Sequence, residues 1–210
     1  MLGDVLLIED KHKKAAETIK DKVLASKKEK MIVAISGESG SGKSELAHSL
    51  AKALQGEGIV AKPLHIDNYY KTHPLERNEW RRKNGIESIG YNEYDWDTIY
   101  KNIDAFKKGE KTQMPCIDLV TQQVDQLITD FNGVDMLIVD GLYSIKTENA
   151  DLNVFIDLTY HETKKAQLKR GKEAVNDFRM QVLEQEHQVV RSLKDRAHLI
   201  VNKNYQVEEA

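Results

Sequence analysis

The sequence predicts an α/β fold in which a central parallel sheet lies between two layers of helices. Two observations lead to this prediction. A short apolar segment at residues 31–35 runs into a glycine-rich loop, and a helical pattern follows the loop. Further apolar segments of strand length alternate with helical patterns along the rest of the chain. Such alternation is typical of doubly wound sheets, in which helices connect parallel strands.

The glycine-rich loop carries the most specific pattern in the chain. Residues 37–44 read Gly-Glu-Ser-Gly-Ser-Gly-Lys-Ser, the pattern of a phosphate-binding P-loop between a strand and a helix. Glycines allow backbone N–H groups to approach a polyanion closely, and the helix directs the positive end of its dipole at the same charge. The sequence therefore predicts a P-loop NTPase fold of the three-layer α/β/α type that binds a nucleoside triphosphate.

We expect the whole loop to bind the triphosphate, through Gly37, Glu38, Ser39, Gly40, Ser41, Gly42, Lys43 and Ser44. The Lys43 ammonium is expected to reach the β- and γ-phosphates, and the Ser44 hydroxyl is expected to bind Mg²⁺. ATP and Mg²⁺ are therefore the expected cofactors.

The other elements are expected in a regular order. Strands are predicted at about residues 31–36, 59–66, 112–118, 136–139, 154–158 and 199–201, and helices at 43–54, 95–107, 161–171 and 175–195, with a short helical pattern around 75–83. A mostly one-sided apolar face over residues 5–26 predicts an amphipathic helix ahead of the core. Packing of that helix on the domain is favoured over a partner-binding arm.

Length and composition predict one domain. We expect a helical extension at residues 1–28 and a domain at 29–210, with an acceptor-site insertion at about 68–118. The net charge of −3, with both signs interspersed, gives no indication of nucleic-acid or membrane binding. Cys116 is the only cysteine, so no internal disulfide can form. No apolar stretch approaches the roughly 20 residues of a membrane span, and we expect a cytoplasmic protein.

Carboxylates are predicted to lie at the carboxyl ends of strands, where ligands bind in such sheets. Asp140 follows Met-Leu-Ile-Val, and a magnesium role is favoured for it over capping of a turn. Asp67 stands where a carboxylate could take the proton of an attacking hydroxyl, with Tyr69 and Tyr70 as walls of an acceptor pocket. A loop aspartate beside core tyrosines explains these residues equally well. Asp118 is the third such carboxylate.

Five blocks of the sequence resemble the uridine kinase and phosphoribulokinase-like family of P-loop kinases. Over roughly residues 31–202 they are the P-loop, His65-Ile-Asp-Asn-Tyr-Tyr-Lys71, Tyr94-Asp-Trp-Asp97, Gly109-Glu-Lys-x-x-x-Pro-x-x-Asp118 and Ile138-Val-Asp-Gly141. The resemblance implies transfer of the ATP γ-phosphoryl group to a hydroxyl of a nucleoside or similar small metabolite. It also implies that Asp67 is the catalytic base, that Lys43 and Ser44 hold phosphate and Mg²⁺, and that Asp140 takes the acidic position near the metal.

The resemblance also places a lid over the basic residues 164–179. In P-loop kinases a lid closes over the phosphates, and its Lys or Arg offsets developing negative charge. We expect Arg170 to be catalytic and Arg179 to contact the substrate, although a solvated helix face explains the same basic residues. His187 and His198 are expected to be structural, with no spacing that suggests a further metal site.

The segments that recognise the acceptor in uridine kinases differ here. Their Asn-Phe-Asp-His-Pro block corresponds to about residues 87–91, which lack both its aspartate and His-Pro. Their Tyr-Asp-Phe segment with a nearby histidine corresponds to Ile117-Asp118-Leu119, with Gln122 near the place of the histidine. We therefore expect a uridine kinase-like enzyme whose small-molecule acceptor differs from uridine. Asp67, Tyr69, Tyr70, Asp118 and Arg179 are the candidate substrate residues.

Two other functions stay open on the sequence. One is a nucleotide-binding regulator without transfer activity, because the acceptor motifs are incomplete. The other is a P-loop hydrolase, although neither a guanine-specific Asn-Lys-x-Asp motif nor a Leu-Ser-Gly-Gly motif is present. The sequence does not fix the oligomeric state, and a homo-oligomer is compatible with it.

Overall fold

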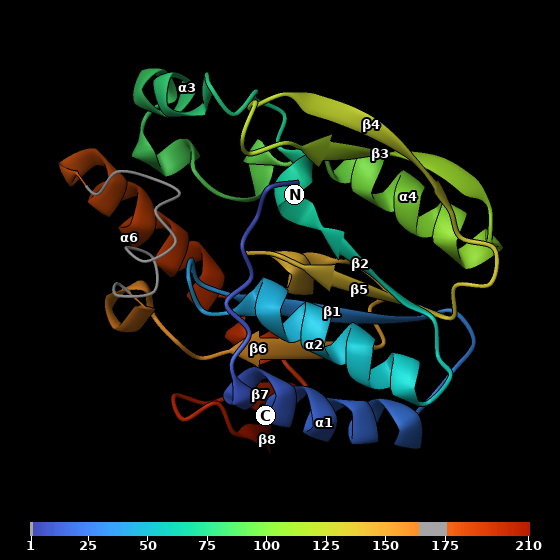
Figure 1. The fold of residues 1–210 in the computed structure, drawn as a ribbon. Coiled ribbons are helices and arrows are strands. Elements are labelled where there is room, and N and C mark those ends of the chain that lie inside the picture. The colour runs from blue at the N-terminus through green and yellow to red at the C-terminus, as the bar shows by residue number, and fades with distance from the viewer. Residues whose placement is uncertain (1, 164–175) are drawn as a thin grey trace.

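The computed structural model describes residues 2–163 and 176–210, and it has a six-stranded sheet with helices on both faces (Figure 1). The strand order is β2-β5-β1-β6-β7-β8. Neighbouring strands from β2 to β7 are parallel, and β8 is antiparallel to β7 at the edge. A separate antiparallel hairpin, β3-β4, lies beside the sheet.

The elements have the following bounds. The strands are β1 (Met31–Gly37), β2 (Ala61–His65), β3 (Lys111–Ile117), β4 (Val124–Asp130), β5 (Met136–Asp140), β6 (Leu152–Ile156), β7 (Leu199–Val201) and β8 (Val207–Glu209). The α-helices are α1 (Asp10–Ala25), α2 (Lys43–Gly56), α3 (Arg77–Asn84), α4 (Trp96–Lys108) and α6 (Asp177–Arg191). The 3₁₀ turns are Ile66–Tyr69, Ile86–Ser88, Tyr91–Glu93, Ser144–Lys146 and Lys194–Arg196. None of the helices within the described ranges is long and apolar enough to cross a bilayer.

The centre of the sheet is completely buried. All residues of β1 and of β5 are buried, which explains why both segments are nearly continuous apolar runs rather than alternating ones. β1 pairs with β5 on one side and with β6 on the other. The P-loop therefore follows a strand that is fully buried and paired on both edges.

Two hydrophobic clusters cover the two faces of the sheet. On one face α1 packs beside α2, where Ile19, Leu46 and Leu50 are fully buried. On the other face α4 and the loops around it bury large aromatic side chains, among them Phe106 and Tyr94. Helices α3 and α6 lie together beyond one end of the sheet (Figure 1). This arrangement confirms the predicted three-layer α/β fold.

Several elements differ from the sequence prediction. The segment predicted as a strand at residues 112–118 pairs with β4 in the hairpin and does not join the sheet. β4 and β8 carry mostly exposed residues, so neither has the apolar pattern from which strands are predicted. Most of the helix predicted at residues 161–171 lies outside the described residues.

The N-terminal helix begins later than predicted, at Asp10. A reciprocal capping interaction between Glu9 and His12 fixes this start. Because α1 shares one hydrophobic cluster with α2, it is packed on the P-loop helix. The boundary proposed near residue 28 stays a prediction.

Candidate active site

The P-loop joins β1 to α2, and two of its glycines are required by close contacts. A Cβ atom on Gly37 would lie 2.8 Å from the Ser41 Oγ. Gly42 has a φ of +92°, and a Cβ atom there would lie 2.3 Å from the Tyr205 hydroxyl. The same hydroxyl donates a hydrogen bond to the Ser41 carbonyl, at 2.9 Å. A side chain at either glycine would therefore distort the loop.

The loop offers hydrogen-bond donors that fit a triphosphate. The Ser41 hydroxyl is buried and has no hydrogen-bond partner in the described part of the chain. The Lys43 ammonium lies over the loop and donates to the Glu38 carbonyl, at 2.8 Å. Backbone N–H groups of the loop and of the first turn of α2 add to this set. Phosphate oxygens would accept hydrogen bonds from both the Ser41 hydroxyl and the Lys43 ammonium.

A hydroxyl and a carboxylate meet where the metal was predicted. Ser44, at the start of α2, donates through its Oγ to the Asp140 Oδ2 at 2.9 Å. Oxygen ligands of this kind suit Mg²⁺, which also keeps phosphate and water ligands. Within the described ranges there is no group of three or more His, Cys, Asp or Glu side chains placed to hold a metal. Ser44 and Asp140 are therefore the protein groups that fit a phosphate-bound magnesium ion.

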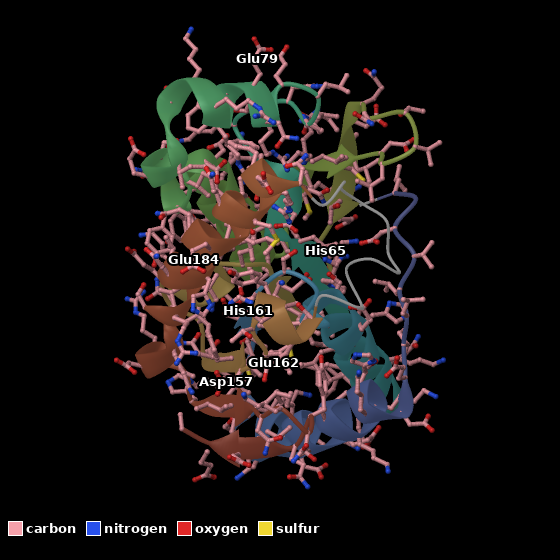
Figure 2. The ribbon with its side chains drawn as sticks, turned by 90° about the vertical axis from the view of Figure 1, so that its left-hand side faces the viewer. His65, Glu79, Asp157, His161, Glu162 and Glu184 are labelled. Atoms are coloured by element: carbon pink, nitrogen blue, oxygen red, sulfur yellow. The ribbon has the colours of Figure 1, made fainter. Side chains whose placement is uncertain are left out.

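His65 completes this cluster, and no role was predicted for it. Its Nδ1 lies 2.5 Å from the Asp140 Oδ1, because β2 and β5 pair with these two residues in register. The charge of Asp140 raises the pKa of His65 above its usual value, against burial, and Asp67 raises it further. Burial would raise the pKa of Asp140, but His65 and then Ser44 lower it. Figure 2 shows His65 near the middle of the molecule.

Asp67 follows β2 and contacts a pair of tyrosines. The Tyr94 hydroxyl lies 3.4 Å from the Asp67 Oδ1 and donates to the Tyr70 hydroxyl at 2.6 Å. The two rings also stack, with centroids 4.2 Å apart. Tyr94 is completely buried, whereas Asp67 and Tyr70 are partly exposed. The structure thus brings Asp67 and Tyr70 together, with Tyr94 between them.

The other two predicted acceptor residues lie elsewhere. Tyr69 points into the core, where it is 2% exposed and its hydroxyl donates to the Asn102 Oδ1 at 2.8 Å. Asp118 follows β3, and its Oδ1 accepts hydrogen bonds from the N–H groups of Val120 and Thr121, at 2.8 and 3.3 Å. The hydrogen bond from Val120 is the main reason why the pKa of Asp118 is lowered. Among the described residues, neither side chain forms a hydrogen bond or ion pair with Asp67 or the P-loop.

A buried ion network joins the acceptor side to the P-loop. Arg81 of α3 forms a two-pronged ion pair with Glu93, at 2.6 and 3.0 Å, and reaches Glu186 of α6 at 3.4 Å. Glu186 also pairs with Arg179, at 3.6 Å, and Arg179 extends to the Ser39 Oγ at 3.5 Å. The structure thus places the predicted lid residue Arg179 at the P-loop. Arg170 lies outside the described residues.

The carboxylate of the P-loop glutamate is engaged by residues outside the loop. The Glu38 carboxylate accepts the Tyr160 N–H at 2.6 Å and contacts the His187 Nδ1 at 2.7 Å. The Tyr160 hydroxyl in turn donates to Glu184, which Figure 2 labels on α6 near His161. These contacts matter because a free carboxylate beside the loop would repel a triphosphate. The structural role predicted for His187 agrees with this position.

Comparison with known proteins identifies the family. The model of the phosphoribulokinase/uridine kinase family matches residues 32–208. The chain belongs to this family. A uridine kinase from Staphylococcus aureus (strain JH9) is 26% identical over 131 residues, which are 60% of this chain and 61% of that protein. A bifunctional alpha-galactosidase/sucrose kinase from Mediterraneibacter gnavus is 27% identical over 194 residues, 86% of this chain.

The chain matches only part of these relatives, about a fifth (21%) of the bifunctional enzyme and 61% of the uridine kinase. Among solved structures, a putative fructose transport system kinase from Silicibacter sp. TM1040 has a TM-score of 0.66 at 17% identity. That match covers 86% of this chain and 94% of that one. The family and the fold of a P-loop kinase are therefore shown, while the acceptor differs among the similar proteins.

Proposed function

We propose that this chain transfers the γ-phosphoryl group of ATP to a hydroxyl of a nucleoside or similar small metabolite. The proposal depends mainly on the position of Asp67. This carboxylate follows β2, two residues after His65, and His65 contacts the Asp140 carboxylate that accepts a hydrogen bond from Ser44 of the P-loop. An acceptor bound beside Tyr70 would have its hydroxyl within reach of Asp67.

Each residue would have a limited task in the reaction. Asp67 accepts the proton of the attacking hydroxyl or orients that hydroxyl. Lys43, the loop N–H groups and Arg179 stabilise negative charge on the transferred group. Ser44 and Asp140 would hold Mg²⁺, which supplies charge neutralisation on the phosphate oxygens when bound. Most of the acceleration in such reactions comes from positioning and electrostatics.

The experiment is product analysis after incubation with ATP, Mg²⁺ and a panel of nucleosides, sugars and hydroxy acids. A phosphorylated metabolite supports the proposal, ADP without such a product indicates a hydrolase, and nucleotide binding without turnover indicates a regulator. Asp67→Asn is expected to lower transfer by about 10²-fold or more while nucleotide binding persists. Asp104→Asn, on an exposed position of α4, is the matched control and should keep full activity. Equal turnover of Asp67→Asn and wild type would remove Asp67 from the mechanism.

A further inference from the structure

Arg77 lies beside the proposed acceptor site and forms no ion pair with any residue that the structure describes. Arg77 is the first residue of α3, and its guanidinium lies 3.4 Å from the centroid of the Tyr70 ring. Its Nε and Nη2 atoms are buried and, within the described residues, have no hydrogen-bond partner. The residue as a whole is partly exposed, but buried N–H groups are costly to leave without a hydrogen bond, and stacking on an aromatic ring offsets only part of that cost. The side chain therefore lacks an anionic oxygen.

The neighbouring arginines do not share this property. Arg81 also lies over the Tyr70 ring, at 6.0 Å, but it is paired with Glu93 and Glu186. Arg179 contacts Glu186. The two carboxylates of the cluster are thus engaged by other cations.

A second unsatisfied donor lies in the same aromatic cluster. Tyr143 is completely buried, and its hydroxyl has no hydrogen-bond partner in the part of the chain that the structure describes. Its ring packs edge-on against Tyr94, with centroids 5.5 Å apart. Because buried polar groups in native proteins are nearly always hydrogen-bonded, two such exceptions around one pair of tyrosines require an explanation. Both groups donate hydrogen bonds, and both lie against the stacked pair of Tyr70 and Tyr94, Arg77 on Tyr70 and Tyr143 on Tyr94.

These donors belong to the same site as Asp67. A continuous series of contacts runs from Asp67 to the Tyr94 hydroxyl, then to Tyr70, and then to the guanidinium of Arg77. The electrostatic effects agree with this proximity. Burial raises the pKa of Tyr70, Arg77 lowers it, and Asp67 raises it again. A small ligand could therefore contact Arg77 at one end and Asp67 at the other.

We propose that Arg77 and Tyr143 bind an anionic group of the phosphoryl acceptor, either a carboxylate or a phosphate. This inference depends on the proposed function, because it assumes that the acceptor hydroxyl lies at Asp67. A guanidinium recognises planar carboxylates and phosphates through paired N–H donors, and the phenol adds a third donor. An uncharged acceptor would leave the charge of Arg77 uncompensated. The inference therefore narrows the acceptor proposed above: among small metabolites with a hydroxyl group, a hydroxy acid or a sugar phosphate is preferred to a neutral sugar or nucleoside.

The test compares pairs of acceptors that differ only in the anionic group. Glycerate is paired with glycerol, and ribose 5-phosphate with ribose, so that one arm tests a carboxylate and the other a phosphate. Transfer is measured as kcat/KM with saturating Mg²⁺ and ATP. Binding is measured separately by calorimetry with Mg²⁺ and a non-hydrolysable ATP analogue, which keeps the P-loop filled.

The variants are Arg77→Gln, Arg77→Lys and Tyr143→Phe. The matched control is Arg82→Gln, because Arg82 on the same helix stacks on Phe178, at 3.9 Å, but is exposed.

We expect one anionic compound to bind and react at least about 100-fold better than its neutral partner. Arg77→Gln should lower that preference by about 10- to 100-fold and Tyr143→Phe by a few-fold, while Arg77→Lys recovers part of it and Arg82→Gln changes nothing. Thermal unfolding of each variant shows whether it is folded. Preference for the neutral partners, absence of binding by both anions, or an unchanged preference in folded Arg77→Gln would overturn the inference. Binding that depends on Arg77 without any transfer would instead refute the proposed function and leave the anion site standing.

Discussion

The ion pair between Arg81 and Glu93 is expected to be important for stability, and Glu93→Gln tests this. Both side chains are 3% exposed, and Glu93 accepts two hydrogen bonds from the guanidinium. The substitution keeps the shape of the side chain but leaves the buried arginine, among the residues that the structure describes, with Glu186 as its one carboxylate partner, at 3.4 Å. Removing one partner of a buried pair costs about 3–5 kcal/mol. For a chain of this length, about 2–4 °C per kcal/mol gives a melting temperature lower by about 6–20 °C.

The assay is thermal unfolding followed by circular dichroism, together with a double variant. Because the cost arises from the unpaired charge, Arg81→Met combined with Glu93→Leu should recover much of the loss. Lys13→Gln is the control, since Lys13 and Asp10 form an exposed pair that should contribute less than about 1 kcal/mol. A melting temperature of Glu93→Gln within about 2 °C of wild type, or a double variant less stable than Glu93→Gln, would refute the reasoning.

Two further predictions concern the loop glycine and the acid stability. Gly42→Ala is expected to weaken binding of an ATP analogue by at least about 10-fold, because the new Cβ would lie 2.3 Å from the Tyr205 hydroxyl at a φ of +92°. The control is Gly58→Ala, because Gly58 has a φ of +74° but a Cβ atom there would meet no atom within 4 Å. Calorimetry should show unchanged binding for this variant, with only a modest loss of stability. Equal effects of the two substitutions on binding would contradict the contact argument. For Asp151, burial raises the pKa, but the Ile32 N–H and Lys28 outweigh it and lower the pKa below its usual 3.8. This carboxylate therefore stabilises the fold above pH 3.8 and loses that effect as the pH falls through its folded pKa. Asp151→Asn should cost about 1 kcal/mol at pH 7 and progressively less below about pH 4 in urea unfolding, and a cost that is constant with pH would exclude this explanation.

Much of the fold could be predicted because its central strands are apolar throughout. Residues 31–36, 136–139 and 199–201 were predicted as strands, and the structure has β1, β5 and β7 there. β4 could not be predicted, because six of its seven residues are exposed and only its pairing with β3 defines it. The same reason applies to β8. An alternating hydrophobic pattern indicates that one face of a strand is buried, and β4 and β8 bury too few residues to show such a pattern.

The site was predictable where a local pattern determines it. The P-loop is continuous in sequence, so its residues could be assigned directly. His65 could not be assigned a role, because its contact with Asp140 depends on the register between two strands that are far apart in the chain. Arg77 and Tyr143 were missed for a similar reason, since their lack of partners is visible only in three dimensions. The assignments of Asp67, Asp118 and the other acceptor residues stay predictions.

The strand order leaves β1 without a neighbouring strand for much of the time that the chain is being synthesised. Met31 of β1 pairs with Met136, which is 105 residues later (136 minus 31). At about 5–20 residues per second, β1 would wait roughly 5–20 s after leaving the ribosome before its first neighbour emerges. During that interval α1 and α2 can shield one apolar face of the strand, but both of its hydrogen-bonding edges stay open. Fragments that end before residue 136 should therefore aggregate, and slowed translation between residues 60 and 135 should increase the demand for chaperones.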